Sequence, residues 1–494
     1  MDKIGFNNEH YVKMQSEKIL ERINSFGDKL YLEFGGKLFD DHHAERVLPG
    51  FKPDTKVKML MQLNDNAEII IVINAENIEQ NKLRGDMGIT YDQEVLRLID
   101  AFNQIGLYVG SVVITHYQNQ PSADKFINRL NALGIKSYKH YIISDYPSNT
   151  ELILSDEGFG KNEYVETTRS LIVVTAPGPG SGKMATCLSQ LYHEQKRGIK
   201  SGYAKYETFP IWNLPLKHPV NLAYEAATAD LNDINMIDPY HLEEYNEKTV
   251  NYNRDIDIFP VLNTMLEKIT GKSPYKSPTD MGVNMVGYAI TDDEIVKKAS
   301  KNEIIRRYYN TKCLVKQGLC NTNALYKIEL LMKQLDISTQ DRPVTTHALQ
   351  KASSSCTPAV SIELNDGRII TAKTSSLLGA CSAALLNALK ELGGIDDENL
   401  LISPAIIEPI QKLKVNNMGN SNPRLHTDEV LIALSICATK DSVASHALDQ
   451  LPKLKGCDAH SSVILSKIDE HIFKKLGINI TCEAEYQTKK LYHK

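Results

Sequence analysis

One stretch of the sequence constrains the fold more than any other. An apolar run over 171–174 leads directly into a glycine-rich turn over 177–182, and a helical pattern opens at Lys183. The apolar run has the length of a strand that is buried on both faces. A strand, a short turn and a helix in this order form a βα unit, so we expect a parallel sheet that is covered by helices.

The same alternation of strand and helix patterns runs through residues 1–210. Short apolar runs alternate there with segments in which apolar residues recur at helical spacing. This pattern predicts an α/β fold with a Rossmann-like parallel sheet and a P-loop-like turn. The expected strands are 30–38, 67–75, 108–115, 139–144 and 170–176, and the expected helices are 91–106 and 122–134, with Ser122 as the N-cap of the second.

The rest of the chain divides into two further regions. Residues 211–337 are polar and carry long helical patterns, as over 292–309 and 323–335, so we expect a mostly helical middle region. Residues 338–494 return to an α/β pattern, with Asn365-Asp366-Gly367 as a hairpin signal and a helix expected over 376–392. We therefore divide the chain into an N-terminal α/β domain (1–210), this middle region and a C-terminal α/β domain.

The glycine-rich turn has the composition of a phosphate-binding loop. Glycines leave backbone N–H groups uncovered, the start of a helix favours an anion, and a lysine adds a positive charge. The candidate ligand-binding residues are Gly178, Gly180, Ser181, Gly182 and Lys183. The alternative is a tight βα turn that ends in a surface lysine and binds nothing.

The turn departs from the P-loop pattern GxxxxGK[ST] at two positions. Pro177 replaces the first glycine, and Met184 stands where a Ser or Thr would bind Mg²⁺. Ser181 is the remaining candidate for that hydroxyl. We therefore do not expect standard Mg-ATP hydrolysis, and the cofactor stays unidentified, with ATP or another nucleotide as the candidate.

Three other loops carry polar side chains that bear on a ligand. Arg84 and Asp86 follow the expected strand 67–75, and ligands of open α/β sheets bind at the carboxyl ends of strands. We therefore add both residues to the ligand-binding candidates, with a solvated turn before a helix as the alternative. The loops 40–46 and 276–284 are candidates for enclosing a second substrate, with a polar loop and a plain linker as their alternatives.

Composition excludes several classes of function. The formal net charge is −5, which argues against a dedicated nucleic-acid-binding protein. No apolar run approaches the roughly 20 residues that cross a bilayer, and the first residues contain no signal core. The eight cysteines form no CxxC pair, so we expect reduced thiols and no metal site. These features predict a cytoplasmic protein without a nucleic-acid or membrane partner.

Several long segments resemble one family of bacterial proteins. Segments 32–51, 81–92, 175–194, 233–245 and 277–290 are similar to the family catalogued as domain of unknown function 1846. The resemblance implies a cytoplasmic protein with a Rossmann-like domain, a helical insertion and a C-terminal domain of deaminase-like topology. It brings no established reaction and no catalytic residues. The zinc signature of deaminases is absent from the sequence, so deamination is not implied.

Two classes of function follow from these observations. The first is an enzyme, a nucleotide-dependent transferase, that binds a small phosphorylated or other anionic ligand at 177–183. The alternative is a protein without turnover, which binds an anionic ligand or serves in an assembly. In either case we expect a homo-oligomer.

Overall fold

The computed structural model describes residues 4–39, 41–84 and 88–487. Within these residues the chain divides into two units. We call residues 4–225 with 233–300 the N-terminal unit, and residues 226–232 with 301–487 the C-terminal unit. The predicted middle region is shared between them, and the three-region boundaries stay a prediction. Among the described residues, no helix combines the length and the apolar composition that crossing a bilayer requires.

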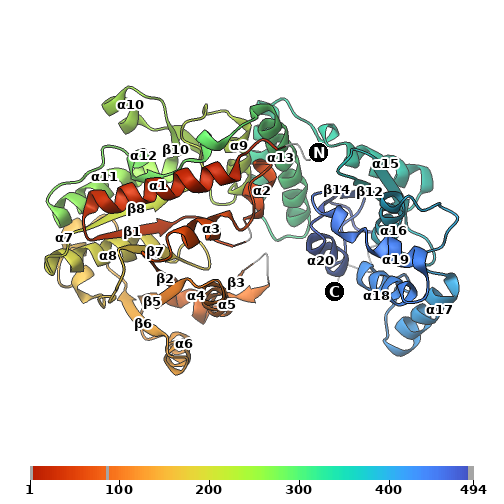
Figure 1. The fold of residues 1–494 in the computed structure, drawn as a ribbon, viewed down its shortest axis with the longest axis horizontal. Coiled ribbons are helices and arrows are strands. Elements are labelled where there is room, and N and C mark those ends of the chain that lie inside the picture. Colours follow the sequence, from red (N-terminus) through yellow and green to blue (C-terminus); the bar gives the residue numbers. More distant parts are fainter. Residues whose placement is uncertain (1–3, 40, 85–87, 488–494) are drawn as a thin grey trace. The chain divides into compact units, whose positions relative to one another are not determined.

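A seven-stranded sheet forms the centre of the N-terminal unit (Figure 1). Its spatial order is β11-β8-β1-β7-β2-β5-β6, and every neighbouring pair is parallel. The predicted parallel sheet is therefore confirmed. The strands are β1 (Lys29–Phe34), β2 (Ala67–Asn74), β5 (Tyr108–Tyr117), β6 (Lys136–Tyr141), β7 (Leu171–Thr175), β8 (Ser201–Tyr206) and β11 (Gly282–Val283).

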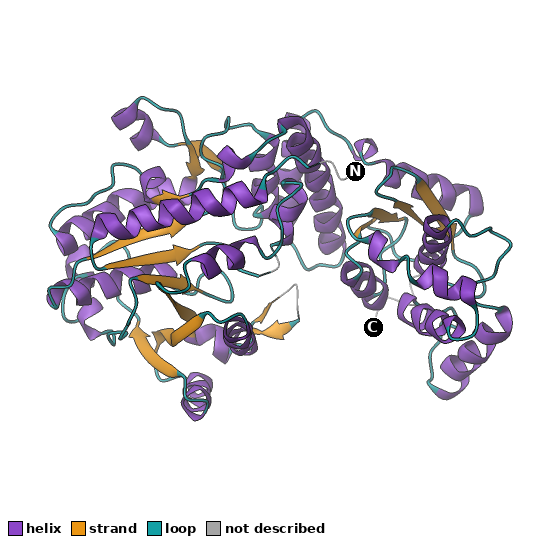
Figure 2. Cartoon of the chain, in the orientation of Figure 1, coloured by secondary structure: helices purple, strands orange, loops and turns teal. Residues whose placement is uncertain are grey.

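Helices cover both faces of this sheet, as Figure 2 shows. Apolar side chains of α8 and α11 pack on alternate residues of the central strands, which places these two helices on one face. On the other face α1 lies across β1 and β8, and the hydroxyls of Tyr11 and Tyr206 are 2.6 Å apart. The helices are α1 (Asn8–Phe26), α2 (His42–Val47), α3 (Thr55–Gln62), α4 (Ala75–Glu79), α5 (Tyr91–Gln104), α6 (Pro121–Ala132), α7 (Thr150–Ile153), α8 (Lys183–Lys196), α10 (Pro239–Tyr245), α11 (Asn253–Thr270) and α12 (Pro278–Met281).

Two short antiparallel pairs accompany the main sheet. They are β3 (Leu83–Arg84) with β4 (Ile89–Thr90), and β9 (Asn235–Ile237) with β10 (Val250–Tyr252). Two helices, α9 (Pro219–Ala227) and α13 (Asp293–Lys316), cross the division between the units.

The C-terminal unit holds a four-stranded mixed sheet of order β13-β12-β14-β15. The outer pair β12–β13 is the hairpin predicted around Asn365-Asp366-Gly367, and Gly367 has the positive φ (+90°) that such a turn needs. β14 is antiparallel to β12, and β15 is parallel to β14. The elements are β12 (Ala359–Glu363), β13 (Ile369–Lys373), β14 (Asp458–Ser461), β15 (Asn479–Cys482), α14 (Thr322–Gln334), α15 (Pro343–Ser355), α16 (Ala380–Gly393), α17 (Pro404–Lys412), α18 (Thr427–Ala438), α19 (Ser442–Leu448) and α20 (Lys467–Lys475).

Several predicted boundaries are wrong by a few residues. β1 covers 29–34 instead of 30–38, because Gly35 and Gly36 follow Phe34 and end the strand. β6 covers 136–141 instead of 139–144, because this edge strand is polar and its apolar residues do not mark its ends. The N-cap of α6 is Gln120, two residues before the predicted cap Ser122, and the helix begins at Pro121. α16 begins at Ala380, because Leu378 forms a β-bridge with Leu425 instead of a helical turn.

Candidate functional site

The glycine-rich loop lies between the end of β7 and the start of α8 at Lys183, as predicted. Gly180 and Gly182 have φ angles of +73° and +85°, where any side chain would strain the backbone. A Cβ atom on Gly178 would lie 2.3 Å from the hydroxyl oxygen of Tyr91. The path of the turn and the approach of Tyr91 therefore account for all three glycines, so the glycines alone do not indicate a ligand.

The carbonyl oxygens of the loop are held by the protein. Thr115 Oγ1, near the end of β5, donates to the carbonyl oxygen of Ser181 at 2.7 Å. Ser181 Oγ donates to the carbonyl oxygen of Gly178 at 2.8 Å. The backbone N–H and the hydroxyl of Thr186 both donate to the carbonyl oxygen of Gly182, each at 3.0 Å. The loop is thus fixed through its acceptor groups, and the hydroxyl protons of Ser181 and Thr186 are both engaged.

The amide groups of the same loop are not held in this way. Within the described residues, the N–H groups of 180–183 have no hydrogen-bond acceptor, and no side chain caps α8. N–H groups at a helix start carry the positive end of the helix dipole. Such a row of free donors is the arrangement that binds a phosphate or a carboxylate.

Lys183 adds a positive charge at the same place. Its side chain is half-buried, and it forms no hydrogen bond or ion pair within the part of the chain that the structure describes. One turn further along α8, burial raises the pKa of the Cys187 thiol; the Glu33 carboxylate adds to this increase and Lys183 opposes it. The side of α8 that carries Lys183 therefore faces Glu33 on β1.

The loop lies at the point where the strand order of the sheet reverses. From β2 the chain continues outward to β5 and β6, whereas β7 lies on the other side of β2. Asn74, at the end of β2, donates from Nδ2 to the carbonyl oxygen of Gly180 at 3.5 Å. Ligands of open α/β sheets bind in the crevice beside such a reversal.

A second group of polar side chains lies at the same edge of the sheet. Lys205, near the end of β8, has its Nζ 2.8 Å from Glu207 Oε1 and also contacts the carboxylate of Asp255 in the first turn of α11. We call Lys205, Glu207 and Asp255 the Lys205 cluster. On the neighbouring strand, Glu33 Oε2 accepts a hydrogen bond from the Tyr203 hydroxyl at 2.7 Å.

Burial and the charges within the Lys205 cluster bring the pKa of one carboxyl group close to neutral pH. Burial is the main cause that raises the pKa of Glu207 to about 7; Asp255 adds to the increase and Lys205 opposes it. Burial also tends to raise the pKa of Asp255, but the Lys205 ammonium outweighs it and lowers that pKa. Burial lowers the pKa of Lys205, but Asp255, Glu207 and Glu33 together raise it above its ordinary value. Glu207 is therefore suited to accept or release a proton near neutral pH.

The opposite end of β1 carries a closed cluster. Lys29, Tyr31 and Glu33 alternate along one face of β1 toward α8. At the amino end, Glu194 Oε1 accepts from Lys29 Nζ at 2.9 Å and from the Tyr31 hydroxyl at 2.7 Å. The Glu194 side chain is fully buried. Its other oxygen, Oε2, has no hydrogen-bond partner among the described residues, so this cluster is closed by burial and not by complete pairing.

The structure does not bring Arg84 to a free position beside the loop. Its guanidinium contacts the carboxylate of the buried Glu94 on α5, and its side chain is 10% exposed. Asp86 lies outside the described residues. The roles of Arg84 and Asp86 in ligand binding stay predictions.

The other predicted polar loops have structural uses. Asp41 caps α2 and forms a buried ion pair with Lys56, whose Nζ is 2.7 Å from Asp41 Oδ2. Ser277 and Asp280 form a capping box at α12. Asp40 lies outside the described residues. Among the residues that are described, no group of three or more His, Cys, Asp or Glu side chains is arranged to hold a metal ion.

Sequence reasoning missed Glu33 and the Lys205 cluster. The available signal was a charged side chain near the end of each of two strands that are otherwise buried, as in the strand that ends with Glu33-Phe34. Burial makes such a charge costly unless it is paired or used. Asp255 gave no comparable signal, because it meets Lys205 only through the fold.

The sequence matches one known family over nearly its whole length. The family model described as domain of unknown function DUF1846, N-terminal, matches residues 4–336, and its C-terminal counterpart matches residues 340–492. The chain is 58% identical to a UPF0371 protein of Streptococcus thermophilus (strain CNRZ 1066), over 100% of both chains. It is 59% identical to a UPF0371 protein of Streptococcus pneumoniae (strain P1031), again over both full lengths. The chain therefore belongs to the DUF1846 family of uncharacterised proteins.

Proposed function

We propose that this protein binds a nucleotide or another phosphorylated metabolite, with a phosphate on the loop of 177–183. The observation that carries the proposal is the row of backbone N–H groups over 180–183, which have no acceptor within the described residues. Lys183 is the first residue of the same helix. Together they supply donors and positive charge where a phosphate needs both.

Group transfer is the chemistry that fits this site best. Fixed N–H groups would orient a phosphate on the loop. The positive ends of their dipoles would stabilise the negative charge that develops on the phosphate oxygens in the transition state. The Lys205 cluster at the same sheet edge supplies a proton acceptor, because the pKa of Glu207 is raised to about 7. The oxygen of an acceptor hydroxyl would form a bond to the terminal phosphorus and pass its proton to Glu207, while the bond from phosphorus to the bridging oxygen breaks and the shortened nucleotide leaves.

The second candidate is a protein without turnover. The packing of Gly178 against Tyr91 favours it, since this contact explains a glycine without any reaction. Ile432 and Ile436 on α18 are 63% and 64% exposed, and exposed apolar side chains of this kind support the expected homo-oligomer. Saturable binding without product during long incubation would favour a ligand-binding or assembly protein over a transferase.

The finer fold assignments and the location of the protein belong to this proposal. The run β6-β5-β2-β7 around the strand-order reversal supports a Rossmann-like assignment. The hairpin β12–β13 beside the parallel pair β14–β15 is compatible with a deaminase-like topology, without the residues for deamination. We retain a cytoplasmic location as part of the proposal.

Calorimetric titration of inorganic phosphate and ATP tests the proposal. Lys183→Ala should lower the affinity for both compounds by about tenfold or more, because a charge-assisted hydrogen bond contributes about 1.5–3 kcal/mol. Lys272→Ala, which removes an exposed lysine of the same unit, is the control and should bind as the wild type does. Wild-type protein that binds neither compound, or Lys183→Ala that binds both unchanged, would refute the proposal.

A further inference from the structure

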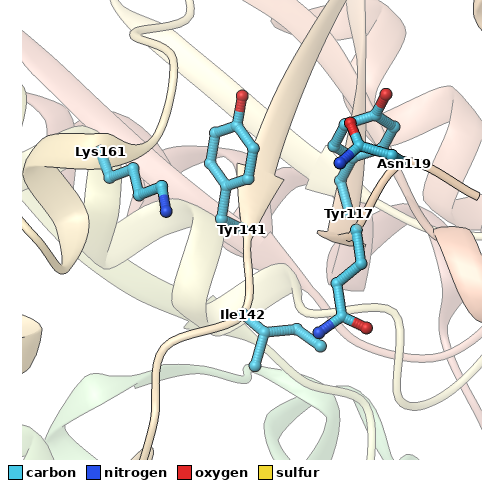
Figure 3. A pocket seen from close by; sticks show the side chains of 6 residues that line it. Tyr117, Asn119, Tyr141, Ile142 and Lys161 are labelled. Carbon is cyan, nitrogen blue, oxygen red and sulfur yellow. The ribbon is translucent and has the colours of Figure 1, made fainter.

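A pocket lies beyond β5 and β6, at the carboxyl edge of the sheet that also carries the glycine-rich loop. Its volume is about 310 Å³, and Figure 3 shows the side chains that line it. Tyr117 and Tyr141 come from the two strand ends, and Lys161 comes from the short 3-10 helix Phe159–Lys161. Gln118, Asn119 and Ile142 complete the lining.

The pocket combines aromatic, cationic and amide groups. The ring centroids of Tyr117 and Tyr141 are 6.0 Å apart, and the planes are inclined by 74°. Lys161 Nζ is 5.2 Å from the centroid of Tyr141. Tyr117 is buried, and Lys139 Nζ lies 4.3 Å from its ring centroid. Tyr141 is therefore the ring that offers a stacking surface for a planar ligand.

The amide side chains of Gln118 and Asn119 are available to a ligand. In the described part of the chain neither forms a side-chain hydrogen bond. An amide group can donate and accept at the same time, as the edge of a nucleobase requires. A base that stacks on Tyr141 could therefore form hydrogen bonds along its edge with the amide side chains of Gln118 and Asn119.

The protein holds one wall of this pocket firmly. The Tyr117 hydroxyl donates to Asp124 Oδ1 at 2.5 Å and accepts from Lys139 Nζ at 3.1 Å. His116 and Asn119 have φ angles of +51° and +62°, which are uncommon for residues other than glycine.

The pocket and the loop are connected through β5. Thr115 on this strand holds the carbonyl oxygen of Ser181, and Tyr117 follows two residues later. β5 lies two strands from β7, a separation on the order of 10 Å at ordinary strand spacing. A nucleotide is long enough to reach from one to the other.

We propose that this pocket takes the base of a nucleotide whose phosphates lie on the loop of 177–183, with the base stacked on Tyr141. The inference rests on the proposed function and names its ligand class. A nucleobase fits this lining, because the ring of Tyr141 can stack on it and the amide side chains of Gln118 and Asn119 can form hydrogen bonds with its edge. The ring would displace Lys161 from the face of Tyr141 or stack on the opposite face.

Titrations of inorganic phosphate, adenosine and the four common nucleoside triphosphates separate the two sites. We expect at least one triphosphate to bind about tenfold or more tighter than phosphate alone, since stacking contributes about 1–3 kcal/mol per base. Tyr141→Ala should remove this advantage and leave phosphate affinity unchanged. Tyr108→Ala, at the amino end of β5, is the matched control, and a thermal melt checks that each variant is folded.

The outcomes distinguish this inference from the proposed function. If no triphosphate binds tighter than phosphate, or if Tyr141→Ala binds all of them as the wild type does, the base pocket is refuted and the phosphate site survives. If adenosine binds and loses affinity in Tyr141→Ala, but phosphate does not bind, the proposed phosphate site fails and the pocket survives. Lys183→Ala should lower the affinity for phosphate and leave the affinity for adenosine unchanged. This result would assign the phosphate to the loop and the base to the pocket.

Discussion

The two ends of the β1–α8 pair use similar side chains for different purposes. At the amino end, the fully buried Glu194 takes a lysine and a tyrosine hydroxyl on one oxygen. At the carboxyl end, Glu33 takes one tyrosine hydroxyl, and Lys183 has no partner among the described residues. Because Glu194 Oε2 also has no partner among the described residues, burial is what separates the two ends: Glu194 is out of reach of solvent, whereas Glu33 and Lys183 are half-buried. The half-buried end is therefore the candidate for function.

The largest expected effect is at the closed end. Glu194→Gln leaves Lys29 buried without its counter-charge, which should lower the free energy of unfolding by about 3–5 kcal/mol. Urea unfolding followed by the fluorescence of Trp212, the chain's single tryptophan and part of the N-terminal unit, measures this loss. The exposed Glu157→Gln is the control. A loss below about 1 kcal/mol would mean that the closed cluster is not structural.

The second effect concerns Glu207, at the carboxyl end of the sheet. Its substitution should raise the free energy of unfolding instead of lowering it. The pKa of Glu207 is raised to about 7 from an ordinary value of 4.5, so the folded state binds this proton more tightly than the unfolded chain does. Its contribution is therefore fully present below pH 4.5 and is lost as the pH rises through about 7. Glu207→Gln should stabilise the protein by about 1–3 kcal/mol at pH 8 and change little at pH 4. Urea unfolding at both pH values decides the matter, and destabilisation at pH 8 would contradict it.

A matched tyrosine pair gives the third effect. Tyr31→Phe removes a donor from the fully buried Glu194, which should cost about 2 kcal/mol. Tyr203→Phe removes a donor from Glu33, which is only half-buried, so water replaces the hydroxyl and the cost should be about 1 kcal/mol or less. Chemical denaturation of both variants tests the ranking. Equal losses in the free energy of unfolding would show that water reaches the two carboxylates equally little.

The smallest effect is expected for Lys183, and Lys29 at the other end is the lysine with which it is compared. Lys183→Ala should change the free energy of unfolding by less than about 0.5 kcal/mol, because the described structure gives its ammonium no partner to lose. Lys29→Ala should cost about 3 kcal/mol, because it leaves Glu194 buried and unpaired. Both are measured by the same unfolding experiment. A large loss for Lys183→Ala would identify a structural role for this lysine.

Local patterns in the sequence predicted much of the N-terminal unit. The strand over 67–74, the helix over 91–104 and the helix start at Lys183 were all predictable, because apolar spacing and glycine positions are local signals. The position of β1 between β7 and β8 was not, because strand order depends on contacts far apart in the chain. The ion pair between Lys205 and Asp255 could not be predicted for the same reason.

The central position of β1 has a consequence for synthesis. This strand leaves the ribosome well before both of its neighbours, which come from residues 171–206, more than a hundred positions later. Until they are made, its apolar side chains and its unpaired backbone have no native neighbour. The nascent chain should therefore depend on chaperones until β8 is complete, and C-terminal truncations before residue 206 should accumulate as insoluble material.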